Sequence, residues 1–259
     1  MSKKATALGV RGVAKVLREM QKGLGDRKPL AVDGSGELVS LLAKELRKGG
    51  DASAVVEGSV ERAAVLVWIG RPDEKALQAA RKAKVPIVAV TDGTTDGPYV
   101  LAEDVVVIPP GQGFPVGEIA EAVARKLGDL GTSLAARLPV LRAAVCNELI
   151  ESCARRNGAV AAAVFVPGVD LPILTTNQIR MVLRIAHAYG EVVDQSRALE
   201  IVGVVGAGYG LRTIAREALD LLPGPGWAIK GAIAYGGTRA MGLAAVKLFE
   251  AKGSVRSRT

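Results

Sequence analysis

The sequence predicts a chain of two parts: an α/β domain built on a parallel sheet, followed by an all-α domain rich in small residues. From Pro29 to about Gly128, short apolar runs alternate with amphipathic stretches. The runs are continuously apolar, as in strands that are covered on both faces of a parallel sheet. From Gly131 onward these runs stop and long helical patterns follow, which predicts the second part.

Length and composition agree with two domains. The chain has 259 residues, of which 49% are apolar but only 3% aromatic, and 31 are glycine. Such a core packs by close approach of backbones rather than by bulky rings. The formal charge of +8 favours an anionic partner, such as a membrane surface, nucleic acid or a phosphate ligand, and it equally suits simple solubility.

The cysteines and the amino terminus favour a cytoplasmic setting. Cys146 and Cys153 are seven residues apart, a spacing that suits neither a zinc site nor a redox pair. Reduced thiols are typical of the cytoplasm. The first residues lack the apolar run and cleavage site of a signal peptide. We expect no metal and no cofactor.

Residues 1–28 contain a basic amphipathic helix from Leu8 to Leu24. One face is apolar, and the other carries Arg11, Lys15, Arg18 and Lys22. A helix of this kind docks on its own domain with a solvated basic face, or lies on an anionic bilayer where these cations contact lipid.

Residues 29–130 are expected to form the α/β domain. The apolar runs predict strands at Pro29–Val32, Ala52–Val56, Ala63–Ile69, Val85–Val90 and Asp104–Ile108. The amphipathic stretches predict helices at Glu37–Lys48, Asp73–Lys84 and Pro115–Leu127. Ligands of such sheets bind at the loops that follow the carboxyl ends of strands.

The first strand leads to Gly34, Ser35 and Gly36, a glycine turn at the start of a helix. A phosphate-binding loop would continue with a lysine and a hydroxyl residue, but this chain has Glu37 and Leu38. Helix amino termini attract anions, so weak phosphate binding at Gly34, Ser35 and Gly36 remains an alternative.

The stretch VLVWIGRPDEKALQAARKAKVPIVAVTDG resembles the strand–helix–strand region of a degenerate Era-like G domain. At Thr91–Thr94 it lacks the Asn-Lys-x-Asp motif that reads guanine in such domains. The resemblance implies a nucleotide-binding fold without GTP hydrolysis. The alternative is an unrelated doubly wound domain with a glycine turn.

Residues 131–259 are expected to be helical. The patterns predict helices at Leu134–Arg156, Gly158–Val166, Pro172–Tyr189, Ser196–Leu222 and Trp227–Ala251. Asp170 is the only charged residue between Arg156 and Arg180. Pro167, Gly168 and Pro172 interrupt this apolar stretch, which predicts a helix, a bend and a second helix.

The region from Leu138 to Gly253 resembles a DUF697-like helical domain of bacterial proteins, which follows the G domain of some Era-like GTPases. The features in common are Pro172 followed by Gln178-Ile179, Tyr189-Gly190, Leu222-Pro223-Gly224 and Lys247-Leu248-Phe249. The resemblance implies a module found in proteins assigned to the inner membrane, without a known reaction.

Small residues recur at a spacing of three to four in the last helices. Gly203, Gly206 and Gly210 form one stripe, and Gly231 with Gly242 belong to another, so we expect these glycines at close helix contacts. No helix offers roughly 20 unbroken apolar residues, which favours a buried core or a re-entrant hairpin over a spanning helix.

Polar groups beside the apolar hairpin are candidates for binding. Arg180 and Arg184 share a helix face and would contact lipid phosphate or a partner, or else pair with Asp170. Trp227 is an interfacial anchor or a core residue. The single His187 lacks a second histidine or nearby cysteine, so it suits neither a metal site nor a catalytic triad.

The sequence therefore predicts a non-catalytic protein, with a degenerate GTPase-like head on a helical module that binds a membrane face or a partner, which includes a second copy in a homo-oligomer. The first alternative is a GTP-binding protein with residual NTPase activity. The second is a basic nucleic-acid-binding protein, although stacking aromatics are few. The expected location is cytoplasmic, peripheral to the inner membrane or partly inserted in it.

Overall fold

The computed structural model describes residues 13–14, 16–20, 27–58, 60–93, 99–164, 171–207 and 226–256. The chain divides into two compact units. Unit 1 combines Met1–Leu24 with Leu149–Thr259, and unit 2 is Gly25–Glu148. The division falls within a long helix rather than at residue 130, and the amino-terminal segment belongs with the helical unit.

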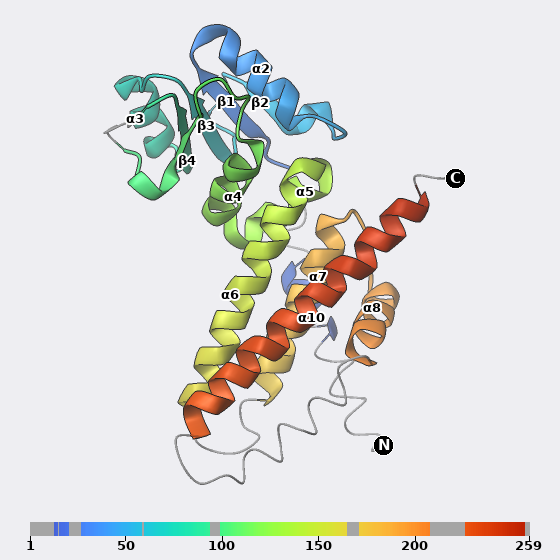
Figure 1. The fold of residues 1–259 in the computed structure, drawn as a ribbon. Coiled ribbons are helices and arrows are strands. Elements are labelled where there is room, and N and C mark those ends of the chain that lie inside the picture. Colours follow the sequence, from blue (N-terminus) through green and yellow to red (C-terminus); the bar gives the residue numbers. More distant parts are fainter. Residues whose placement is uncertain are drawn as a thin grey trace. The chain divides into compact units, whose positions relative to one another are not determined.

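Unit 2 is built on a five-stranded parallel sheet with the strand order β2-β1-β3-β4-β5 (Figure 1). The strands are β1 (Leu30–Gly34), β2 (Val55–Glu57), β3 (Val65–Ile69), β4 (Ile87–Thr91) and β5 (Val105–Val107). All residues of β3 and β4 are buried, which explains their continuously apolar sequence. This order is doubly wound and reverses direction between β1 and β3.

Three helices cover this sheet: α2 (Gly36–Leu46), α3 (Glu74–Lys82) and α4 (Val116–Leu127). Leu77 and Ala80 of α3 share a core with Leu66 and Trp68 of β3. The chain moves in opposite directions from β1 to β2 and from β3 to β4, so right-handed crossovers place α2 and α3 on opposite faces (Figure 1). Helix α4 packs against β3, β4 and β5.

The strand expected at Ala52–Val56 begins later than the apolar run. Ala52–Ala54 form a 3-10 turn, and β2 is the short segment Val55–Glu57. The Asp51 carboxylate accepts a hydrogen bond from the Ser53 backbone N–H at 2.8 Å. This cap stabilises a helical turn, which local apolar character alone does not reveal.

The helix expected at Leu134–Arg156 is interrupted. Helix α5 (Gly131–Arg137) ends before a 3-10 turn at Pro139–Leu141, and α6 then runs from Arg142 to Ala163. Leu138 is extended because it precedes proline. Arg142 spans the break, with Nε donating to the Ala135 carbonyl at 3.2 Å. The helix expected separately at Gly158–Val166 is instead the end of α6.

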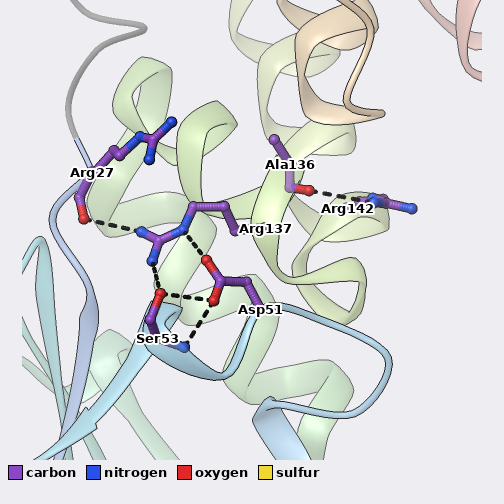
Figure 2. A network of polar contacts seen from close by, with 6 residues as sticks. All are labelled: Arg27, Asp51, Ser53, Ala136, Arg137 and Arg142. Carbon is purple, nitrogen blue, oxygen red and sulfur yellow. Dashed lines mark hydrogen bonds and ion pairs between the residues drawn. The ribbon is translucent and has the colours of Figure 1, made fainter.

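Arg137 joins three segments of unit 2 (Figure 2). Its Nε donates to Asp51 Oδ2 at 2.9 Å, and its other nitrogens donate to Ser53 Oγ at 3.1 Å and to the Arg27 carbonyl at 3.0 Å. The hydrogen bond from the Ser53 hydroxyl, followed by that from Arg137, lowers the pKa of Asp51 from 3.8 to about 2. The network holds α5 at the edge where the strands begin.

Unit 1 contains the rest of α6 with α7 (Leu171–Ala188), α8 (Gln195–Ala207) and α10 (Gly226–Arg256). Helix α7 packs against α10 and α8. Buried residues of α10 recur every three or four positions at Ala234, Thr238, Gly242, Ala245 and Phe249. This spacing keeps one stripe of the helix against its neighbours.

Candidate functional site

The glycine turn of unit 2 lies against the end of β3. The Ser35 backbone N–H donates to the Ile69 carbonyl at 2.9 Å. Gly34 has a φ of +131°, and a Cβ there would lie 2.0 Å from that same carbonyl oxygen. A Cβ on Gly70 would lie 2.0 Å from Ser35 Oγ. Backbone contacts therefore occupy the space between the β1 and β3 ends.

The charges near this turn are mostly negative. Asp33 Oδ1 accepts from the Gly34 N–H at 2.8 Å, and Glu37 is exposed in the first turn of α2. Asp73 caps α3, which follows β3 at the same edge. Carboxylates repel phosphate groups, so the charges around Gly34, Ser35 and Gly36 disfavour an anion there.

A buried polar network links three helices of unit 1. Asn157 of α6 is fully buried, and its Nδ2 donates to Thr238 Oγ1 of α10 at 3.0 Å. Its Oδ1 accepts from Asn177 Nδ2 of α7 at 2.8 Å. Gln178 Nε2 also donates to Thr238 Oγ1, at 3.2 Å. Because these groups satisfy one another, they fix the register of α6, α7 and α10.

Beyond this network, the three helices form an end that is almost without charge, which we call the apolar end. It comprises residues 159–164, 171–176 and 228–236, and Lys230 is its one charged residue. Ala161, Leu174 and Ala234 form its core. Ile173 and Ile229 are 49% and 45% exposed, so large apolar side chains reach solvent here.

On each helix, the charged residue next to the apolar end, on the side of the helix centre, is an arginine. These are Arg156 on α6, Arg180 on α7 and Arg239 on α10. We call these three residues the arginine collar. They occupy the same stretches of the helices as the buried polar network. Arg156 is exposed, and Arg180 forms an ion pair with Glu19.

The third collar residue belongs to a cluster between α6 and α10. Arg239 Nε donates to Glu151 Oε1 at 2.7 Å, and the Tyr235 hydroxyl donates to Glu151 Oε2 at 2.6 Å. The hydrogen bond from Tyr235, followed by that from Arg239, lowers the pKa of Glu151. The carboxylate is thereby held in its charged form beside the collar.

The basic helix at the amino terminus is described only in part. Val13, Val16, Leu17 and Met20 are buried within the structure. Arg18 is exposed, and its Nε donates to the Ala14 carbonyl of the same helix at 3.3 Å. This burial favours docking on unit 1, whereas Arg11, Lys15 and Lys22 lie outside the described residues.

Two further predicted contact residues give less information. Arg184 lies on α7, is partly buried and has an interaction partner. Trp227 lies in the first turn of α10, but its side chain is outside the described part.

The predicted packing glycines differ from one another. A Cβ on Gly231 would lie 3.1 Å from the Gly158 carbonyl oxygen, and one on Gly242 would lie 2.5 Å from Ile150 Cγ1. Both glycines therefore stand at close contacts between α6 and α10. Gly203 is exposed, and a Cβ there would meet no atom of the described residues within 4 Å, so the described part shows no close contact at this position. The surroundings of Gly206, and Gly210 itself, lie outside the described part of the chain.

Within the described ranges, no group of three or more histidine, cysteine or acidic residues could hold a metal ion. Cys146 and Cys153 are buried and unbridged. None of the described helices combines the length and apolar character needed to cross a bilayer.

Comparison with known proteins found no matching family model, curated protein or solved structure.

The buried polar network could not be predicted from the sequence, because Asn157 and Thr238 are 81 residues apart. The collar left a visible signal: each of the three apolar helix ends is bounded by an arginine.

Proposed function

We propose that this chain is a non-catalytic, membrane-associated protein. The helical unit inserts its apolar end into the surface of an anionic bilayer, and the α/β unit is a GTPase-like head that has lost nucleotide chemistry. The observation that carries the proposal is the apolar end bounded on all three helices by the arginine collar.

The dimensions of the apolar end suit the interfacial region of a bilayer. Six helical residues, such as 171–176 of α7, rise about 9 Å, and interfacial helices bury their apolar faces about 5–10 Å deep. The exposed side chains of Ile173 and Ile229 would enter the acyl region. At that depth the collar arginines would lie at the level of the lipid phosphates, where arginine side chains are favourable.

The internal packing of unit 1 also fits this environment. Helix pairs in membranes associate through small residues and interhelical hydrogen bonds, as between Gly158 and Gly231 and between Asn157 and Thr238. Such packing leaves larger apolar side chains for the outer surface. The net charge of +8 adds attraction to anionic lipid.

The charges of the α/β unit support a head without phosphate chemistry. Asp33 and Glu37 flank the glycine turn, at the place where a phosphate-binding loop needs a lysine. We infer that this head serves a partner or the fold itself rather than a nucleotide.

Cosedimentation of the full chain with vesicles of phosphatidylglycerol and phosphatidylcholine tests the proposal. Burying an isoleucine side chain contributes about 1.5–3 kcal/mol, so Ile173→Glu and Ile229→Glu should each weaken binding at least about tenfold. Leu41→Glu is the matched control, because Leu41 is 52% exposed on α2 of the other unit. It should change binding less than about twofold.

Salt separates surface attraction from insertion. Arg156→Glu should weaken binding at low ionic strength and matter less at high salt, because screening removes the electrostatic part. Insertion of the apolar end would be ruled out if both isoleucine variants bound vesicles as tightly as the original chain and if high salt abolished the binding. If Ile173→Glu instead lowers the molecular mass in solution without vesicles, a second copy of the chain is the occupant and the membrane proposal fails.

A further inference from the structure

A cavity of about 330 Å³ lies at the amino edge of the sheet in unit 2, away from the glycine turn. It opens where β3 and β4 begin and where α4 leads into α5. Its lining includes Lys28, Lys84, Val85, Lys126, Leu127 and Leu134. A second cavity of about 530 Å³ shares Lys84, Val85, Pro86 and Lys126, so the two adjoin. This size is within the range of small-ligand sites.

The smaller cavity combines an apolar floor with positive charge. Leu127 and Leu134 are buried, and Val85 is 7% exposed. Three lysines line the cavity against one carboxylate, Glu61. Lys126 is held by an ion pair with the buried Asp104 carboxylate. This pairing fixes the position of the lysine but reduces its charge.

Lys84 differs from the other two lysines. Among the described residues, no carboxylate forms an ion pair with it. Its φ of +58° is left-handed, and it ends α3 by donating its backbone N–H to the Arg81 carbonyl at 3.0 Å. Glycine is the favoured residue at this position of a helix end, because a Cβ is strained there. Lys84 is exposed and lines both cavities, so its charge is available to a ligand there.

We propose that this cavity binds a small organic anion: a carboxylate, sulfate or phosphate monoester carrying an aryl or short alkyl group. The charged group meets Lys84 and Lys126, and the apolar group packs on Val85, Leu127 and Leu134. The proposal rests on unit 2 alone and is independent of membrane binding by unit 1.

Isothermal titration calorimetry of the full chain with 1-naphthyl phosphate tests the proposal. Inorganic phosphate and 1-naphthol test the two halves of the ligand separately, and each should bind at least about tenfold more weakly than the whole probe. Lys84→Glu should weaken binding of 1-naphthyl phosphate by about tenfold or more. The control Lys75→Glu changes the same charge at the other end of α3 and should alter the affinity less than about twofold.

Lys84→Gly separates a ligand role from a structural one. Glycine relieves the left-handed strain, so thermal unfolding without ligand should shift upward by about 2–4 °C while binding of the probe weakens. A fall in the unfolding temperature would instead mean that Lys84 stabilises the carboxyl end of α3, and the proposal would be overturned. Absence of saturable probe binding, or equal effects of Lys84→Glu and Lys75→Glu, would overturn it as well. If Lys84→Glu does not fold, the loss of probe binding is measured with Lys84→Gly instead.

Discussion

Protonation of His187 couples folding to pH near neutrality. This residue is the single histidine of the chain, burial lowers its pKa from 6.5, and its buried Nε2 has no hydrogen-bond partner in the described structure. The folded form therefore favours neutral imidazole. As the pH falls below 6.5, the unfolded chain takes up a proton that the folded chain resists, so stability decreases.

We predict that the free energy of unfolding falls between pH 7 and about 5.5 and that His187→Gln removes most of this dependence. Urea titrations at several pH values measure it. Three carboxylates with lowered pKa values, Asp51, Glu151 and Asp194, contribute at lower pH, because their stabilisation is lost as the pH falls below about 4. A slope near pH 6 that persists in His187→Gln would contradict the assignment.

At the scale of elements, α10 carries two glycines with opposite expected responses. A Cβ on Gly242 would lie 2.5 Å from Cγ1 of the buried Ile150, whereas one on Gly236 would meet no atom of the described segments within 4 Å. We predict that Gly242→Ala destabilises the fold by about 1–3 kcal/mol through overpacking against α6. Gly236→Ala should stabilise it by up to about 1 kcal/mol through higher helix propensity.

Chemical denaturation of both variants gives the comparison directly. The same substitution is made twice in one helix, so propensity is matched and only the neighbour differs. Equal effects at the two positions would show that α10 does not approach α6 as closely as these contacts indicate.

At the scale of the whole molecule, the two units have separate cores. The sheet core is closed by α2, α3 and α4, and the helical core by α6, α7 and α10. We therefore predict two thermal transitions in calorimetry. Arg137→Lys keeps the charge but loses the guanidinium fork to Asp51, Ser53 and Arg27, so it should lower only the transition of unit 2, by a few degrees.

Gly242→Ala should lower only the other transition, that of unit 1. A single transition that both variants shift together would mean that the units fold as one body. The helix α6, which contributes residues to both units, would then be the element that couples them.

Part of the candidate site could be predicted from the sequence. The glycine turn at Gly34, Ser35 and Gly36 and the absence of a following lysine are local facts. The apolar stretch around Asp170 and the arginines that bound it are local as well. The partners of Asn157 and the cavity at Lys84 could not be predicted from the sequence. Both are formed by residues from segments that lie far apart in the chain.

The sequence by itself determined which segments are strands and which are helices, because burial on both faces leaves continuous apolar runs and burial on one face leaves a helical period. It also located the apolar stretch between Arg156 and Arg180. Only the tertiary structure decided the strand order, the break at Leu138, the start of β2 and the contacts of Gly242 as opposed to Gly203. These features depend on caps, turns and neighbours that folding brings together. The pattern of apolar residues shows which side chains must be buried, but it does not show which residues bury them.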